Sequence, residues 1–185
     1  MRFLKGEDMI LKDKVCLITG TSRGIGASIL NNFAKEGAVI YANARETGCI
    51  DDKAKYLEDK YECLIKPVYF DICDSKAVKL AIKNIQEEQG RLDVLVNNAG
   101  IMKDALIGMA SKDLMREIFE TNVFASMDLL QLASRLMKRK RNGSIINFSS
   151  IVGKNGNEGQ IVYSASKGAV ISMTKLLLKS WLYII

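Results

Sequence analysis

Tyr163 and Lys167 carry the clearest chemistry in the sequence, because they lie four positions apart in the stretch YSASK. The apolar periodicity from Val162 to Leu182 predicts a helix, and residues four apart on a helix share one face. A lysine ammonium beside a phenol favours the ionised phenol, which makes Tyr163 a usable proton donor or acceptor near neutral pH. The alternative is an incidental surface pair.

Two more polar residues precede this helix. Ser150 comes thirteen residues before Tyr163, and its hydroxyl could donate a hydrogen bond to a substrate oxygen, or simply cap a turn. Asn122 falls inside a long predicted helix, where asparagine has poor propensity. It is either functional or a tolerated polar residue.

Two glycine-containing runs follow predicted strands, and the first offers a place for a phosphate group. The run TGTSRGIG at 19–26 follows a predicted strand and opens a predicted helix, so its free backbone N–H groups could bind a pyrophosphate. Three residues lie between its first two glycines and one residue between the next two, unlike the pattern GxGxxG. The run NNAG at 97–100 also follows a strand. Either run could be an ordinary turn.

Alternating strand and helix patterns must position these residues. The expected strands are 14–19, 39–42, 64–70, 93–96 and 144–148, and the expected helices are 25–35, 51–60, 75–89, 111–140 and 162–182. This alternation predicts an α/β, doubly wound parallel sheet of order 3-2-1-4-5. Ligands bind such sheets at the carboxyl ends of the strands, where the candidate residues lie.

Composition sets limits on other functions. The chain has 185 residues, enough for one domain, and a formal net charge of +6. It contains no histidine, which excludes histidine metal sites and Ser-His or Cys-His nucleophiles, and no metal is expected. The four cysteines lack CxxC spacing and indicate reduced thiols in a cytoplasmic protein. The N-terminus has no secretory signal pattern, and the apolar C-terminal LLLKSWLYII is too short to span a membrane.

Taken together, the motifs resemble the short-chain dehydrogenase/reductase family, with a Rossmann-type fold. The resemblance implies that Tyr163 is the general acid, Lys167 binds the nicotinamide ribose, Ser150 polarises the substrate carbonyl, and Asn122 holds a water that relays protons. It implies a further set of cofactor-binding residues besides Tyr163 and Lys167: Gly20, Ser22, Arg23, Gly24, Ile25, Gly26, Arg45, Asp71, Ile72, Asn98, Ala99 and Gly100.

Within that family, two stretches look most like 3-oxoacyl-[acyl-carrier-protein] reductases of fatty acid biosynthesis. They are NNAGIMKDALIGM and GQIVYSASKGAVISMTK. The resemblance implies an NAD(P)H-dependent carbonyl reductase or alcohol dehydrogenase for a small-molecule or carrier-bound carbonyl substrate. We expect NADP(H) rather than NAD(H), because no acid precedes Glu46 at the end of the second strand, and Arg23 and Arg45 suit a 2′-phosphate.

The chain ends soon after the YSASK helix, so we expect it to lack the sixth and seventh strands of family members. We therefore expect residues 1–11 to be an N-terminal extension and 12–185 an incomplete single domain. The alternative function is an impaired remnant that binds nucleotide or pairs with full-length homologues. A homo-oligomer is expected, without nucleic acid or membrane partners. The basic run 138–141 is either a helix C-terminus or a carrier-docking site near the active-site mouth.

Overall fold

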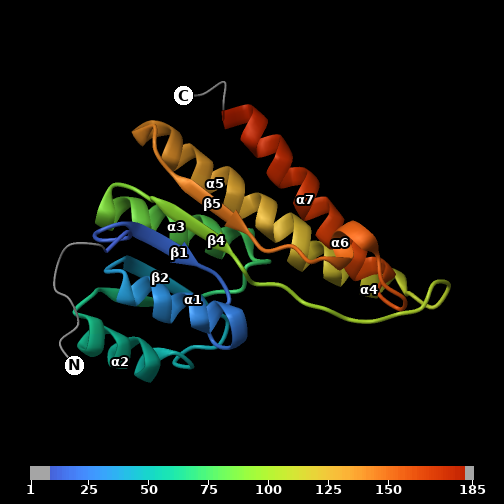
Figure 1. Ribbon diagram of the computed structural model, residues 1–185, viewed down its shortest axis with the longest axis horizontal. Coiled ribbons are helices and arrows are strands. Elements are labelled where there is room, and N and C mark those ends of the chain that lie inside the picture. Colours follow the sequence, from blue (N-terminus) through green and yellow to red (C-terminus); the bar gives the residue numbers. More distant parts are fainter. Residues whose placement is uncertain (1–8, 182–185) are drawn as a thin grey trace.

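A single parallel sheet forms the centre of the protein in a computed structural model that describes residues 9–181 (Figure 1). The five strands lie in the order β3-β2-β1-β4-β5. They are β1 (Val15–Ile18), β2 (Val39–Ala44), β3 (Ile65–Tyr69), β4 (Val94–Asn97) and β5 (Ser144–Asn147). The predicted fold class and strand order are confirmed.

Helices connect the strands and cover both faces of the sheet (Figure 1). They are α1 (Gly24–Lys35), α2 (Asp51–Tyr61), α3 (Ser75–Gln89), α4 (Lys112–Phe119), a π-helical turn η1 (Glu120–Phe124), α5 (Ala125–Lys140), α6 (Val152–Asn155) and α7 (Ile161–Trp181). The helix predicted over 111–140 is therefore interrupted by a π-helical turn, and the short α6 was not predicted.

Alternate side chains of the central strand β1 pack into two apolar cores, one on each face of the sheet. Leu17 packs with α3 and α5 residues such as Ile82 and Leu129 on one face. Ile18 packs with α1 and α2 residues such as Leu30 on the other face. Strands buried on both faces are continuous apolar runs, as VCLI is in β1.

The N-terminal segment is described only from Met9 onward, so residues 1–8 of the predicted extension lie outside the described residues. Leu11 packs against the core that contains Ile18. The backbone N–H of Asp13 donates to the carbonyl of Gly37, 3.0 Å away. These contacts attach this part of the chain to the domain.

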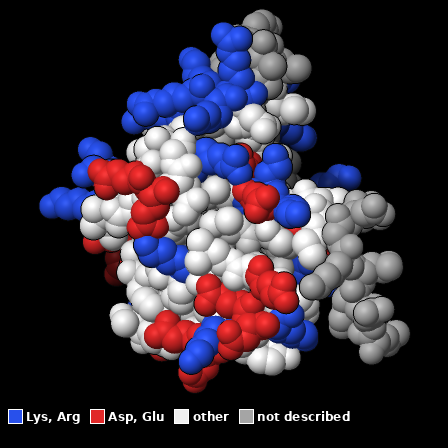
Figure 2. Space-filling model, turned by 90° about the vertical axis from the view of Figure 1, so that its left-hand side faces the viewer, with Lys and Arg blue, Asp and Glu red and all other residues white. Residues whose placement is uncertain are grey.

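The basic run 138–141 forms the last turn of α5 and its left-handed cap, Arg141. It precedes Ser144, which pairs with Val94 at the amino ends of β5 and β4. Figure 2 shows Lys and Arg side chains gathered at this end of the molecule. Lys138 lies 14 positions after Phe124, the last residue of η1, which is about 21 Å along the helix at about 1.5 Å per residue. Of the two alternatives, the helix C-terminus is therefore confirmed, and a carrier-docking site near the active-site mouth is wrong for a single chain, because the strands' carboxyl ends lie on the opposite side.

The last helix, α7, is long and apolar enough by length and composition to cross a membrane. Its first half is instead built into the domain. Ser166 and Lys167 are buried there, and both form hydrogen bonds to segments outside the helix. Among residues 9–181, β5 pairs with β4 alone.

Candidate active site

The glycine-rich turn between β1 and α1 depends on two glycines. Gly20 has a φ of +71°, in the left-handed region that favours glycine. A Cβ at Gly26 would lie 2.0 Å from the carbonyl oxygen of Gly20. Because that distance is far inside van der Waals contact, only glycine at 26 lets α1 begin so close to the turn.

Thr19 joins this turn to the NNAG loop that follows β4. Its buried hydroxyl donates to the carbonyl of Val96, 3.2 Å away, and accepts from the backbone N–H groups of Asn98 and Ala99, each at 3.1 Å. The Asn98 amide in turn donates to the carbonyls of Thr19 and Gly20. Sequence reasoning missed Thr19, although its position at the end of a buried strand beside the switch point was a usable signal.

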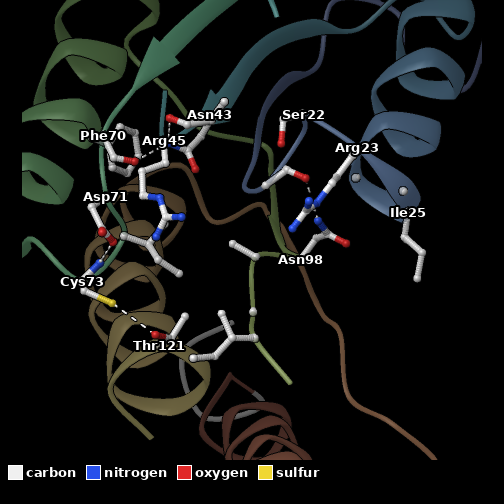
Figure 3. Close-up of a pocket in the computed structure, with 18 of the residues that line it drawn as sticks. Ser22, Arg23, Ile25, Asn43, Arg45, Phe70, Asp71, Cys73, Asn98 and Thr121 are labelled. Atoms are coloured by element: carbon white, nitrogen blue, oxygen red, sulfur yellow. Dashed lines mark hydrogen bonds between the residues drawn. The ribbon is translucent and has the colours of Figure 1, made fainter. Parts of the chain in front are cut away.

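A cavity of about 570 Å³ opens at the carboxyl ends of the strands (Figure 3). Its wall includes all the predicted cofactor-binding residues except Tyr163 and Lys167: Gly20, Ser22, Arg23, Gly24, Ile25, Gly26, Arg45, Asp71, Ile72, Asn98, Ala99 and Gly100. Seven lining residues were not predicted: Asn43, Ala44, Phe70, Cys73, Ile101, Glu117 and Thr121. The cavity thus collects residues from four strand ends, as the sheet topology requires.

Two exposed arginines line this cavity together with the carboxylates of Asp71 and Glu117. Arg23 and Arg45 are exposed, and neither forms an ion pair with a described residue. Helix α1 begins at the cavity without an acidic residue in its first turn, so the positive end of its dipole is uncompensated there. Strand β2 runs two residues further than predicted, to Ala44, which places Arg45 directly after it.

Asn122 lies in the π-helical turn η1 and is 2% exposed. Its Oδ1 accepts from the backbone N–H of Ile101 at 2.8 Å, and its Nδ2 donates to the carbonyl of Ile101 at 2.9 Å and to the Ser166 hydroxyl at 3.1 Å. The Ser166 hydroxyl donates to the carbonyl of Tyr163. The side chain of Asn122 therefore connects the loop after β4 with α7, and it forms no hydrogen bond with Lys167 among the described residues.

Lys167 and Tyr163 lie one turn apart on α7, as predicted. The Lys167 Nζ lies 5.8 Å from the centroid of the Tyr163 ring and donates to the carbonyl of Phe148 at 2.8 Å. Burial lowers the pKa of the Lys167 ammonium below its ordinary value. A Cβ at Gly100 would lie 3.0 Å from Asn122 Oδ1 and 3.6 Å from Lys167 Nζ, so both groups lie around the last residue of the NNAG loop.

Ser150 follows β5 and is half-buried. Its hydroxyl oxygen accepts a long hydrogen bond, 3.4 Å, from the backbone N–H of Val152 at the start of α6. No hydrogen bond joins Ser150 to Tyr163 within residues 9–181. The contact leaves the hydroxyl proton of Ser150 free to be donated.

Close contact between α6 and α7 holds the Ser150 segment against the helix of Tyr163. A Cβ at Gly153 would lie 2.7 Å from the backbone carbon of Lys167. The Ser149 hydroxyl donates to the carbonyl of Lys167 at 2.8 Å. The four predicted catalytic residues are thus carried by three neighbouring segments: η1, the turn after β5 and α7.

Comparisons with known proteins agree with this arrangement. The family model for short chain dehydrogenase matches residues 14–183. The chain is 38% identical over 167 residues to 3-oxoacyl-[acyl-carrier-protein] reductase from Thermotoga maritima, covering 90% of this chain and 68% of the relative. It is 37% identical to the reductase of that name from Vibrio cholerae, covering 90% of this chain and 67% of the relative.

Two solved structures share the fold at 29% identity. L-sorbose reductase from Gluconobacter frateurii, complexed with NADPH and L-sorbose, matches with a TM-score of 0.90. The match covers 96% of this chain and 68% of the reductase chain. Gluconate 5-dehydrogenase from Burkholderia cenocepacia, in complex with NADP and tartrate, matches with a TM-score of 0.88. This match covers 95% of this chain and 69% of the dehydrogenase chain. The chain thus spans about two thirds of the length of these relatives. The resemblance inferred from the motifs is confirmed, and the chain belongs to the short chain dehydrogenase family of oxidoreductases.

Proposed function

We propose that this protein is an NADP(H)-dependent carbonyl reductase, acting as an alcohol dehydrogenase in the reverse direction. One observation carries the proposal. Gly100 lines the cavity, and Lys167 Nζ and Asn122 Oδ1 both lie around it. The residues suited to nucleotide binding and those suited to proton transfer therefore meet at Gly100.

The cavity wall fits a dinucleotide. The start of α1, with glycine at 24 and 26, offers free N–H groups and a positive dipole end to a pyrophosphate. Ala44 ends β2 where an acid would otherwise bind a ribose 2′-hydroxyl, and Arg45 follows it. With Arg23, this arrangement supports NADP(H) over NAD(H), since arginine matches phosphate geometry. The two related structures named above hold NADPH and NADP.

In the proposed mechanism the bound cofactor supplies or accepts the hydride. Tyr163 donates its phenolic proton to the oxygen of the substrate carbonyl, and accepts it in the reverse direction. The Ser150 hydroxyl donates a hydrogen bond to that same oxygen and polarises the carbonyl. The Lys167 ammonium, held by Phe148, stabilises the charge left on Tyr163 and is available to the nicotinamide ribose. Asn122 holds the loop and helix that carry these groups.

The substrate side is apolar. Ile151, which follows Ser150 in the sequence, is 68% exposed. Met102, on the loop after β4, is 58% exposed, and its sulfur lies 3.5 Å from the Gln160 amide just before α7. Exposed apolar side chains after Ser150 and on the loop after β4 support a substrate with an acyl portion. We therefore infer 3-oxoacyl-[acyl-carrier-protein], reduced to its 3-hydroxyacyl form, as the substrate class.

We also infer that the subunits associate as a homo-oligomer. Phe124 is 51% exposed where η1 meets α5, and Leu178 is 70% exposed on α7. Association would remove such apolar surface from water. Light scattering on the purified chain tests this inference, and a monomer at high concentration would contradict it.

The function is tested by incubating the purified chain with NADPH and an acetoacetyl thioester, and measuring NADPH consumption and 3-hydroxybutyryl product. We expect equimolar consumption and product. Tight NADPH binding without turnover would instead support a nucleotide-binding remnant. Absence of binding to either NADPH or NADH would contradict the proposal.

A further inference from the structure

Asn43 is the second-last residue of β2, and its buried side-chain amide belongs to a residue that lines the nucleotide cavity. It is 2% exposed. Figure 3 shows it beside Phe70 and Arg45. Its Nδ2 lies within hydrogen-bonding distance of three backbone carbonyls, those of Ala44 (3.2 Å), Val68 (3.3 Å) and Phe70 (3.0 Å).

These three partners fix the orientation of the amide. All three are carbonyl oxygens, which only accept, so the donating NH₂ of Asn43 must face them. The Oδ1 atom then faces away from β3, and it has no partner among residues 9–181. The fully enclosed side-chain atoms without a partner in this range are at Asn97 and Ser164, so Asn43 Oδ1 is not fully enclosed, and Asn43 lines the cavity. The protein thus presents a buried, oriented and unoccupied acceptor to the ligand space.

The same residue joins three segments of the cavity wall. The backbone carbonyl of Asn43 accepts from both the N–H and the hydroxyl of Thr21, each at 2.9 Å, in the glycine-rich turn. Its amide holds the carbonyl of Phe70, the residue before Asp71. Because each bond restrains a different segment, the position of Oδ1 is fixed before any ligand arrives, which is the condition for a specific contact.

We propose that Asn43 is a nucleotide-binding residue whose Oδ1 accepts a hydrogen bond from a donor on the adenosine half of the cofactor. The inference rests on the proposed function, because it requires a dinucleotide in this cavity. The adenosine half of NADP(H) offers two kinds of neutral donor, the 6-amino group of adenine and the ribose 3′-hydroxyl. Its 2′-phosphate offers none at neutral pH, and it suits Arg23 and Arg45 instead.

The experiment compares dissociation constants of the full 185-residue chain for NADPH and two analogues. One analogue has purine in place of adenine and lacks the 6-amino group; the other lacks the 3′-hydroxyl. For the unaltered protein, we expect one of these deletions to weaken binding about three- to tenfold, the range for a single hydrogen bond. In Asn43→Ala, the same deletion should cost about twofold or less, because the acceptor is gone.

A structural role alone would not produce this coupling, because a loosened cavity would still discriminate between NADPH and the analogue. Arg45→Ala is the matched control: it should lose preference for the 2′-phosphate and keep the preference for the donor group. If Asn43→Ala fails to melt cooperatively, Asn43→Ser replaces it, since serine retains a hydroxyl donor for β3 but is too short to present Oδ1.

Equal losses for both analogues in the unaltered protein and the Asn43 variant would overturn the inference while NADPH binding itself stands. Failure of the unaltered chain to bind NADPH would instead overturn the proposed function as well. The two failures are distinguishable, because in the first the unaltered chain still binds NADPH and in the second it does not.

Discussion

The side-chain ammonium of Lys167 is anchored 2.8 Å from the backbone carbonyl of Phe148. This hydrogen bond joins α7 to the segment that carries Ser150, two residues after Phe148. It also keeps a largely desolvated cation beside the Tyr163 ring. The site therefore keeps a buried lysine where an apolar side chain would pack more easily, and this has a measurable consequence.

Burial should make the stability contributed by Lys167 depend on pH. Its pKa is lowered in the folded state, so the unfolded chain binds more protons between the folded and the ordinary pKa. The stability of the unaltered protein relative to Lys167→Met should therefore rise as the pH increases toward the ordinary lysine pKa of about 10.4. Urea unfolding of both proteins at neutral and alkaline pH measures this difference. A relative stability that falls with pH would contradict it.

Gly26 should be irreplaceable for steric reasons, whereas Gly24 should not. A Cβ at 26 would meet the Gly20 carbonyl at 2.0 Å, but a Cβ at 24 would meet no atom within 4 Å. We expect Gly26→Ala to lower the free energy of unfolding by about 1–3 kcal/mol and to weaken NADPH binding. Gly24→Asn, which tolerates the positive φ of 56°, should cost less than about 1 kcal/mol. Similar losses in the two variants would show that the turn is not closed by this contact.

Arg45 should set the choice between NADPH and NADH. Removing a charge-assisted hydrogen bond costs about 1.5–3 kcal/mol, so Arg45→Ala should weaken NADPH binding by about ten- to hundredfold. NADH binding should change little, because NADH lacks the 2′-phosphate. Fluorescence titration with both cofactors gives the ratio. Parallel weakening of the two would place Arg45 elsewhere than at the 2′-phosphate.

Asn122 should matter for stability and for turnover together. Asn122→Leu leaves the Ile101 N–H and carbonyl without their partner, at about 1–3 kcal/mol for each buried group. Turnover should also fall, because the loop that ends at Gly100 and the helix of Tyr163 lose their connection. Thermal melting and steady-state kinetics test the two effects. A variant that melts like the unaltered protein would show that water replaces the amide.

The sequence alone predicted the sheet order and the edge at which the candidate residues gather. Both follow from local patterns, because a buried parallel strand such as VCLI is a continuous apolar run and its carboxyl end is fixed by chain direction. The cavity residues near Gly20, Asp71 and Asn98 could be predicted for the same reason, because they follow the carboxyl ends of such strands. The Tyr163–Lys167 relationship needed only the helical period.

What the sequence could not provide depends on tertiary contacts. The π-helical turn at Glu120–Phe124 accompanies the bonding of Asn122 to Ile101, twenty-one residues away. Asn43 acts through backbone carbonyls on and after the neighbouring strand β3, which no spacing in one chain segment reveals. For the basic run 138–141, the helix C-terminus is confirmed, whereas carrier docking near the active-site mouth is wrong, because α5 leads directly into the amino end of β5.

The central claim is that Tyr163 supplies the proton for carbonyl reduction beside a bound nicotinamide. The most direct measurement compares the unaltered chain with Tyr163→Phe, using NADPH titration and turnover of an acetoacetyl thioester on the same preparations. We expect the variant to bind NADPH within about twofold of the unaltered chain, and its kcat to fall by about 10²–10⁴, the usual contribution of general acid catalysis. Turnover retained in Tyr163→Phe, with NADPH binding intact, would contradict the account and place the proton donor elsewhere.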